Sequence, residues 1–389
     1  FSKKLQAKLE NYLFLTGAIF LSLLLKYFLL DYESPDYIEA LSIWYDTIKS
    51  QGGFAALKNG KFSDYNTSYL YIMASLTYLP IHKLYAIKLV SILFDYAAAF
   101  WVYKIVKFKY PNQSYAILAF TLVIFAPSLL LNSSLWAQCD VIYTSFLLMS
   151  TYYFIKYSQN QEDKYSKIIA LLAFGFALAF KLQAVFFVLP LLFLYLNRKV
   201  IWYEFLLIPL VLLLFILPNY FLGRPFMDLI LIYGHQILNY PRLSLNCPNI
   251  YQLLPTAPYE FFMPAGIVLT FSAVLAFCFL FLRKKITFKA ENFIQIILIS
   301  LLLIPFLLPK MHERYFFAAD IFAIVYAFYF PKRWFLPILI GGISIFSYAG
   351  FLFELPFQFS SLALVLAAII ALVIRDFLKS LHQQNDSGI

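Results

Sequence analysis

The chain has 389 residues, of which 62% are hydrophobic and 13% are charged, and its formal net charge is +10 at pH 7. A soluble domain carries about 25% charged residues, so this composition excludes an ordinary soluble protein. The basic residues form short clusters between apolar runs, which indicates membrane topology rather than nucleic-acid binding. These runs are too long for the strands of a β-barrel, so we expect an all-α polytopic membrane protein.

Apolar runs of spanning length follow one another along the whole chain. Lys181 interrupts the stretch 166–197, and two short helices with the lysine at their outer turn explain it better than one long helix. The sequence therefore predicts about twelve transmembrane helices, at 12–30, 84–106, 114–131, 140–157, the pair within 166–197, 201–221, 261–283, 291–309, 315–331, 333–353 and 357–376.

Twelve spans place both termini on the same side of the membrane. Of the 30 Lys and Arg residues, 19 fall on that side, so the positive-inside rule makes it cytoplasmic. We expect one integral domain, residues 1–376, in a cell membrane, followed by a cytoplasmic tail, residues 377–389. Two long segments, 31–83 and 222–260, would then lie outside the membrane and carry interfacial helices.

The first outer segment is unusually acidic. Residues 31–66 contain six of the twenty acidic residues of the chain: Asp31, Glu33, Asp36, Glu39, Asp46 and Asp64. Ser34 and Pro35 are typical of a helix N-cap followed by proline at the first helical position. An amphipathic interfacial helix is predicted from residues at helical spacing, namely Ile38, Leu41, Tyr45 and Ile48. Asp36 falls in its first turn, where a carboxylate can serve chemistry or simply stabilise the helix dipole.

Two further outer turns carry conspicuous polar residues. Gln138 and Asp140 lie in SLWAQCDVIY, where Asp140 can either act at a site or cap the helix that follows. Lys181 and Gln183 lie between two short spans. A lysine at such a place is costly unless it is paired or faces a cavity, so we expect it to be functional.

Residues 309–315, PKMHERY, run against the charge bias of the chain. They put Lys310, His312 and Arg314, with Glu313, on the outer face, where the positive-inside rule disfavours cations. Arg and Lys are the usual donors to phosphate groups. The turn therefore favours a bound anion.

The long outer segment 222–260 offers hydrogen-bonding groups that a sugar would need, at Asn246, Asn249 and Tyr251, although Asn is also a common turn residue. Cys139 and Cys247 are both expected outside. A disulfide between them stays open, but two unpaired residues are favoured.

The order of these features resembles the GT-C superfamily of membrane glycosyltransferases, and within it bacterial integral-membrane proteins related to the GPI mannosyltransferases. The resemblance is carried by D-Y-x-x-x-L-x-x-W-Y at 36–45, Gly52-Gly53, Asp64-Tyr65-Asn66, W-x-Q-C-D at 136–140, F-K-L-Q at 180–183, N-x-P-N-x-Y-Q at 246–252 and P-K-M-H-E-R-Y at 309–315. One departure is Ser42, where the family often has proline.

The resemblance implies an inverting transfer of a hexose, mannose or glucose foremost, from a polyprenyl-phosphate sugar to an acceptor hydroxyl on the extracytoplasmic side. A carboxylate of the first outer loop is the base in such enzymes. This role carries over to Asp36, with Asp31 as the runner-up. The donor phosphate, expected between Asp36 and Arg314, would be stabilised by Arg314, His312, Lys310 and Lys181.

The resemblance also implies partners and the remaining contacts. The residues assigned to the sugar or the acceptor are Gln138, Asp140, Gln183, Asn246, Asn249, Tyr251 and Glu313. The lipid-phosphate sugar is a co-substrate, and no metal or other cofactor is expected. The acceptor is a glycan, glycolipid or protein of the cell envelope. The sequence determines neither the sugar nor the acceptor.

Two other functions remain open. A transporter or flippase of lipid-linked sugars would suit the broken helix pair at 166–197 and its lysine. Against it, the sequence shows no internal repeat, and its notable charges lie at one face. A non-catalytic scaffold or receptor would leave the acidic segment and the PKMHERY turn unexplained.

Overall fold

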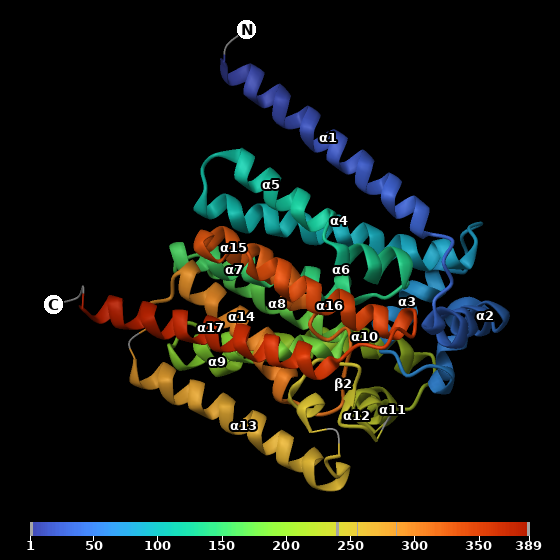
Figure 1. Ribbon diagram of the computed structural model, residues 1–389. Coiled ribbons are helices and arrows are strands. Elements are labelled where there is room, and N and C mark those ends of the chain that lie inside the picture. The colour runs from blue at the N-terminus through green and yellow to red at the C-terminus, as the bar shows by residue number, and fades with distance from the viewer. Residues whose placement is uncertain (1–2, 239–240, 255, 285, 387–389) are drawn as a thin grey trace.

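The computed structural model describes residues 3–238, 241–254, 256–284 and 286–386 of the chain (Figure 1). Helices make up most of this part. The strands found in it are two short ones, β1 (Ser244–Leu245) and β2 (Met311–His312), which pair in parallel. The expected all-α fold class is confirmed.

The helices fall into a bundle and a group of shorter elements. The bundle consists of α1 (Lys3–Leu29), α4 (Lys83–Lys109), α5 (Gln113–Ile124), α6 (Pro127–Leu130), α7 (Asp140–Gln159), α8 (Lys164–Phe180), α9 (Val188–Leu196), α10 (Leu207–Phe221), α13 (Tyr259–Arg283), α14 (Ala290–Leu307), α15 (Phe317–Tyr329), α16 (Leu336–Leu352) and α17 (Phe359–Asp386). The short α-helices are α2 (Ser42–Ser50), α3 (Thr67–Leu76), α11 (Phe226–Ile230) and α12 (Ile232–Leu238). The 3₁₀ and π turns are η1 (Tyr37–Leu41), η2 (Gly53–Lys58), η3 (Gly60–Phe62), η4 (Leu131–Leu135), η5 (Leu182–Phe187), η6 (Trp202–Leu206), η7 (Ile250–Leu253) and η8 (Pro331–Arg333).

The chain is a multi-pass membrane protein. Among the described residues, seven helices are long and apolar enough to cross a membrane, and one bent pair would make an eighth. A helix lies at each of the twelve predicted spans. Several of these helices are too short or too polar to count by length and composition alone, so the number twelve stays a prediction.

Two breaks in the bundle shape the site. Helix α8 ends at Phe180, Lys181 is extended, and η5 begins at Leu182, which confirms the predicted split at Lys181. The run predicted at 114–131 is instead bent by 44° between α5 and the stretch that starts at Pro127. Proline lacks the N–H that a continuous helix needs, and the residue before it avoids the helical conformation.

The centre of the bundle is apolar on all sides. Helix α14 is 89% buried over its most apolar window, whereas α1 is only 17% buried over its own. Helices α1 and α13 lie at the flanks in Figure 1. A helix that is hydrophobic all round belongs in an interior, so α14 forms the core and the flanking helices face the surroundings.

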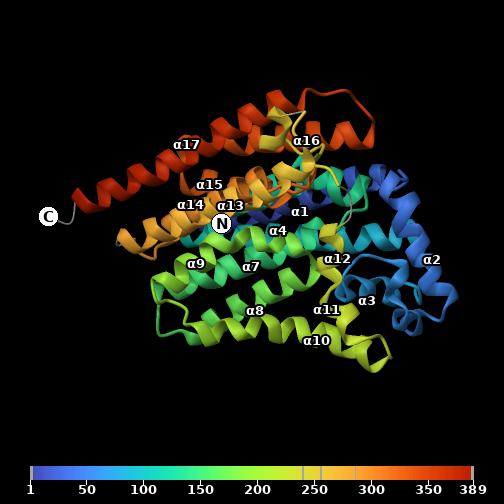
Figure 2. The same cartoon turned by 90° about the horizontal axis from the view of Figure 1, so that it is seen from below.

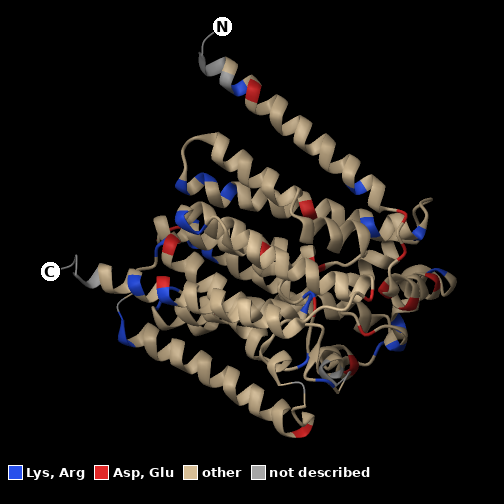
Figure 3. Ribbon diagram, viewed as in Figure 1, with Lys and Arg blue, Asp and Glu red and all other residues tan. Residues whose placement is uncertain are grey.

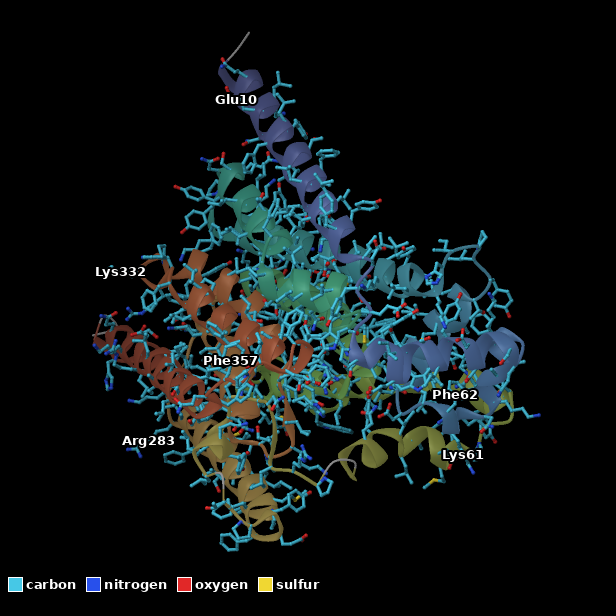
Figure 4. The ribbon with its side chains drawn as sticks, turned by 45° about the vertical axis from the view of Figure 1, so that its right-hand side comes forward. Glu10, Lys61, Phe62, Arg283, Lys332 and Phe357 are labelled. Atoms are coloured by element: carbon cyan, nitrogen blue, oxygen red, sulfur yellow. The ribbon has the colours of Figure 1, made fainter. Side chains whose placement is uncertain are left out.

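The short helices gather toward one end of the bundle. Helices α2, α3, α11 and α12 lie on the right in both Figure 1 and Figure 2. Acidic residues are frequent at this end, while many Lys and Arg residues lie at the other (Figure 3). Figure 4 shows Lys61 at the opposite end from Arg283 and Lys332. The acidic segment and the basic loops predicted to be cytoplasmic are thus separated by the bundle, and the side that faces the cytoplasm stays a prediction.

Candidate active site

The acidic segment begins with the predicted N-cap. Helical structure starts at Pro35, and the Ser34 hydroxyl accepts a hydrogen bond from the Tyr37 backbone N–H at 3.2 Å. The same hydroxyl donates to the Trp136 carbonyl oxygen at 2.7 Å. Ser34 therefore caps its own helix and ties it to the turn that precedes α7.

A π-helical turn directly follows Asp36 and shifts the predicted face of this helix. The buried residues are Tyr37, Leu41, Tyr45 and Ile48, whereas Ile38, expected on that face, is 54% exposed. Ile38 lies inside the π turn at Tyr37–Leu41, whose wider winding changes the rotation per residue, so Tyr37 faces inward in its place. Turns of this kind are frequent at functional sites.

A cavity of about 680 Å³ opens beside Asp36. Its walls come from the acidic segment, from the Lys181 break, from the 222–260 loop and from the 309–315 turn. Of the residues assigned from the sequence, those lining it are Asp36, Gln138, Lys181, Gln183, Asn246, His312, Glu313 and Arg314. Segments far apart in the sequence thus form one polar site.

The carboxylate of Asp36 is held through a single oxygen. Oδ2 accepts hydrogen bonds from Trp136 Nε1 at 3.0 Å and from Gln138 Nε2. Arg314 Nη1 lies 3.6 Å from the same oxygen. Within the described part of the chain, Oδ1 receives no hydrogen bond. The carboxylate is therefore fixed in orientation, with one oxygen left to accept a proton.

Arg314 lies among three carboxylates. Its Nη1 is 2.7 Å from Glu313 and 3.6 Å from Asp36, and its Nε is 3.8 Å from Asp140. The guanidinium also lies over the Trp136 ring, with its central carbon 5.3 Å from the ring centroid. Burial works to lower the pKa of Arg314, but the charges of Asp36, Glu313 and Asp140 outweigh it and raise the pKa well above its ordinary value.

Lys181 is buried and paired, which is what its position in a membrane protein requires. Its Nζ lies 2.5 Å from Asp140 Oδ1, and both side chains are less than one tenth exposed. Asn132 Nδ2 donates to the other oxygen of Asp140 at 2.9 Å. Asp140 is also the first residue of α7, so it takes part in a buried ion pair at the start of that helix.

The predicted outer turn around Gln138 is not exposed to solvent. Residues 132–140 are all buried. The bend before Pro127 folds this stretch back into the protein, where it forms a wall of the cavity together with the acidic segment. The π turn η4 and the positive φ of Ala137 (67°) complete the change of direction. This corrects the expectation of a short turn at the surface.

Glu313 is buried next to His312 and Arg314, with 2% of its side chain exposed. Burial works to raise the pKa of Glu313, but the hydrogen bond with His312 and the charge of Arg314 outweigh it, so the pKa lies below its ordinary value. His312 itself lies in β2 and pairs with Leu245 of β1. The 222–260 loop is thereby joined to the 309–315 turn through the backbone.

Five assigned residues lie outside the cavity lining, and one of them is Asp140, which pairs with Lys181 behind it. Asp31, the runner-up base, is exposed and accepts a hydrogen bond from the Tyr85 hydroxyl at 2.7 Å. Lys310 Nζ lies 5.9 Å from the centroid of the Tyr259 ring. The other two hold the long loop against the end of α14, through bonds from Asn249 to the Leu308 carbonyl at 3.4 Å and from Tyr251 to the Leu307 carbonyl at 2.7 Å.

The cysteines are unpaired. Cys139 and Cys247 are both buried and free, and so is the half-buried Cys278. Burial raises the pKa of Cys247 well above its ordinary value, so its thiol stays neutral. In the part of the chain that the structure describes, no group of three or more His, Cys, Asp or Glu side chains is placed to hold a metal ion.

Several lining residues received no role from the sequence. Tyr65 donates from its hydroxyl to Gln138 Oε1 at 3.3 Å and belongs to the Asp64-Tyr65-Asn66 motif. Asp64 belongs to the same motif; desolvation in the cavity and the nearby charge of Asp36 raise its pKa. Lys61 and Arg242 line the cavity as well, and nothing in their sequence surroundings indicated it.

A comparison with known families supports the resemblance seen in the motifs. Residues 68–221 match the family described as dolichyl-phosphate-mannose-protein mannosyltransferase, which is of the GT-C type. The chain is a GT-C-type membrane glycosyltransferase. No curated protein matches it.

The match covers less than half of this glycosyltransferase. It runs from α3 to α10 and includes Trp136, Asp140 and Lys181, but it begins after Asp36 and ends before Arg314. Roles for the last two residues therefore rest on the geometry of the cavity. The narrower resemblance to relatives of the GPI mannosyltransferases stays a prediction.

Proposed function

We propose that this GT-C enzyme transfers a hexose from a polyprenyl-phosphate sugar to an acceptor hydroxyl, with inversion at the anomeric carbon, on the extracytoplasmic side of the membrane. The observation that carries the proposal is the way the two carboxylate oxygens of Asp36 are bonded. One of its oxygens is fixed by Trp136, Gln138 and Arg314, and the other is left for the substrate.

The proposed step is a single displacement in which Asp36 is the general base. The acceptor oxygen attacks the anomeric carbon while its proton passes to Asp36 Oδ1. The bond between the anomeric carbon and the phosphate oxygen breaks, and its electron pair leaves with the phosphate. The attack comes from the face opposite the leaving group, which accounts for inversion. The step uses no metal or other cofactor.

Arg314 links the two halves of this step. Before transfer its charge is balanced by Asp36, Glu313 and Asp140. When Asp36 takes the proton, one of those negative charges disappears while the leaving phosphate gains one. The positive charge of Arg314 is then available to the phosphate at the moment it is needed, as electrostatic stabilisation of a transition state requires.

The cavity wall also suits a carbohydrate. Amide and hydroxyl groups line it at Gln183, Asn246 and Ser244, and the rings of Trp44 and Tyr65 lie 5.1 Å apart at their centroids. Polar groups of this kind hydrogen-bond sugar hydroxyls, while aromatic rings cover the apolar face of a sugar ring. These features support a sugar substrate without selecting mannose over glucose.

The test is transfer by the purified full chain in nanodiscs, with labelled polyprenyl-phosphate mannose or glucose and no ion gradient. Asp36→Asn keeps the shape and removes the base, so we expect transfer to fall by about 10²–10⁴-fold, while donor binding is retained. The matched control is Glu39→Gln, a carboxylate one turn along that also lines the cavity.

Full activity in Asp36→Asn would reject the assignment, and loss confined to Asp31→Asn would move the role to Asp31. The helix break at Lys181 also suits a transporter of lipid-linked sugars. Movement of the labelled lipid between leaflets, with no product in any variant, would establish that function instead.

A further inference from the structure

The cations of the cavity fall into two groups. Arg314 and Lys181 face carboxylates at distances of 2.5–3.8 Å. The gap of 3.6 Å between Arg314 Nη1 and Asp36 Oδ2 is that of an ion pair, so Asp36 balances the charge of Arg314 until Asp36 is protonated. A donor phosphate that enters this cavity therefore needs other cations.

Lys61 and Arg242 are the second group. Both line the cavity, both are exposed to its solvent, and neither forms an ion pair or hydrogen bond through its side chain with the described residues. They come from different loops, Lys61 from the acidic segment and Arg242 from the 222–260 loop. Their charges are thus not neutralised by the protein.

The backbone beside each of these cations is anchored. Gly60 packs under the buried guanidinium of Arg224, since a Cβ at residue 60 would lie 1.9 Å from the Arg224 Cζ. Next to Arg242, the Leu243 carbonyl accepts a hydrogen bond from the Lys310 N–H at 2.8 Å, and β1 follows at once. Each cation thus extends from a backbone that is held in place, while its side chain has no ion-pair or hydrogen-bond partner among the described residues.

The two loops also meet at a common seam. Gln236 Nε2 donates to the Asp64 carbonyl oxygen, and Asn66 Nδ2 donates to the Tyr233 hydroxyl at 2.8 Å. Lys61 lies three residues before the first contact and Arg242 six residues after it. The seam therefore joins the two loops that carry these cations, and both side chains line the same cavity.

We propose that Lys61 and Arg242 form the phosphate subsite of the cavity and bind the phosphate of a lipid-linked sugar donor and of the polyprenyl phosphate that leaves. This proposal rests on the proposed function. The donor is a phosphodiester with one negative charge, whereas a phosphate monoester carries about −1.5 to −2 at pH 7. Two unpaired cations therefore bind the leaving group more tightly than the donor, which favours cleavage.

The test is binding of farnesyl phosphate, a short isoprenoid phosphate, to the full chain in nanodiscs of zwitterionic lipid. Lys61→Ala and Arg242→Ala each remove a charge-assisted hydrogen bond, so we expect each to weaken binding by roughly tenfold or more. Lys61→Arg keeps the charge and should retain the affinity. The control is Lys58→Ala, an exposed lysine of the same loop that does not line the cavity.

Unchanged affinity in the Lys61→Ala/Arg242→Ala double variant would overturn the proposal. So would equal competition by inorganic phosphate, which would show that no lipid is recognised, or equal binding of farnesol. The proposed function is judged separately by sugar transfer. An enzyme that transfers sugar but binds farnesyl phosphate without these residues refutes the subsite alone, whereas binding that needs them without any transfer refutes the reaction alone.

Discussion

Lys88 provides the sharpest test of how the scaffold supports the site. This lysine is fully buried in α4, and its Nζ donates to the carbonyl oxygens of Leu29, Leu30 and Tyr32 at 3.1, 2.8 and 2.7 Å. These carbonyls belong to the end of α1 and to the chain that leads to Asp36. Lys88 therefore closes the C-terminus of α1, where carbonyls lack helical partners and a cation is favoured by the helix dipole.

The destabilisation caused by removing the Lys88 ammonium can be worked out from these contacts. In Lys88→Met the side chain still fills its space, but the carbonyls lose their donor. Each buried carbonyl left unsatisfied costs about 1–3 kcal/mol, and partial relaxation brings the sum to roughly 3–5 kcal/mol, as for other broken buried charge networks. The unfolding entropy is about 2.1 cal/mol/K per residue, so a destabilisation of this size lowers the thermal unfolding midpoint of a 389-residue chain by roughly 4–6 °C.

Thermal unfolding in detergent, followed with a thiol-reactive dye, suits this measurement because Cys139 and Cys247 are buried until the chain opens. The matched control is Lys83→Met on the same helix. Lys83 pairs with Asp46 at 2.5 Å, but the Lys83 side chain is only half-buried (27% exposed) and that of Asp46 is exposed (59%), so the loss of this pair should cost at most about 1 kcal/mol. Equal shifts in both variants would refute the reasoning about Lys88.

Two further predictions concern other charged groups. Lys26 and Asp95 form a buried pair at 2.5 Å, and Ser133 donates to the same carboxylate at 2.6 Å. Lys26→Met should destabilise the protein by about 3–5 kcal/mol, and adding Asp95→Leu should restore much of that loss, because the stranded carboxylate is gone; a double variant as unstable as the single one would contradict this. Asp64 has a raised pKa in the fold, so the unfolded chain loses the proton first and stability falls as pH rises above the ordinary value of 3.8. Asp64→Asn should therefore raise the thermal unfolding midpoint at neutral pH and leave it unchanged at acid pH. The same increase at neutral and at acid pH would show that the raised pKa of Asp64 is not the cause.

Much of the architecture was predictable because it depends on local patterns. The apolar runs predicted helices at the right places, and the cost of a lysine in an apolar environment predicted the break at Lys181. The Ser34 cap was also readable, since capping depends on neighbouring residues only. By contrast, the bend before Pro127 carried the Trp136 stretch into the interior, and nothing in the local pattern determined where a bent span ends.

The site was predictable only where a residue type was costly or out of place. Asp36 and Arg314 stood out for that reason, and the structure places them 3.6 Å apart. Arg242 did not stand out, because an arginine in a long outer loop is ordinary. Whether a cation is neutralised depends on contacts made across the fold. The sequence therefore identified Lys181 and Arg314 but not Lys61 or Arg242, and it did not show which cations of the cavity were already paired.

The parallel pairing of β1 with β2 bears on how this enzyme could be re-engineered. Main-chain groups make the pairing, so its register depends on chain length more than on side-chain identity. A loop grafted from a relative in place of 222–260 would have to keep an arginine two residues before β1 and keep β1 in register with β2. A shifted register would move that arginine along the cavity relative to Arg314, so chimeras built by matching loop ends alone would separate the two cations.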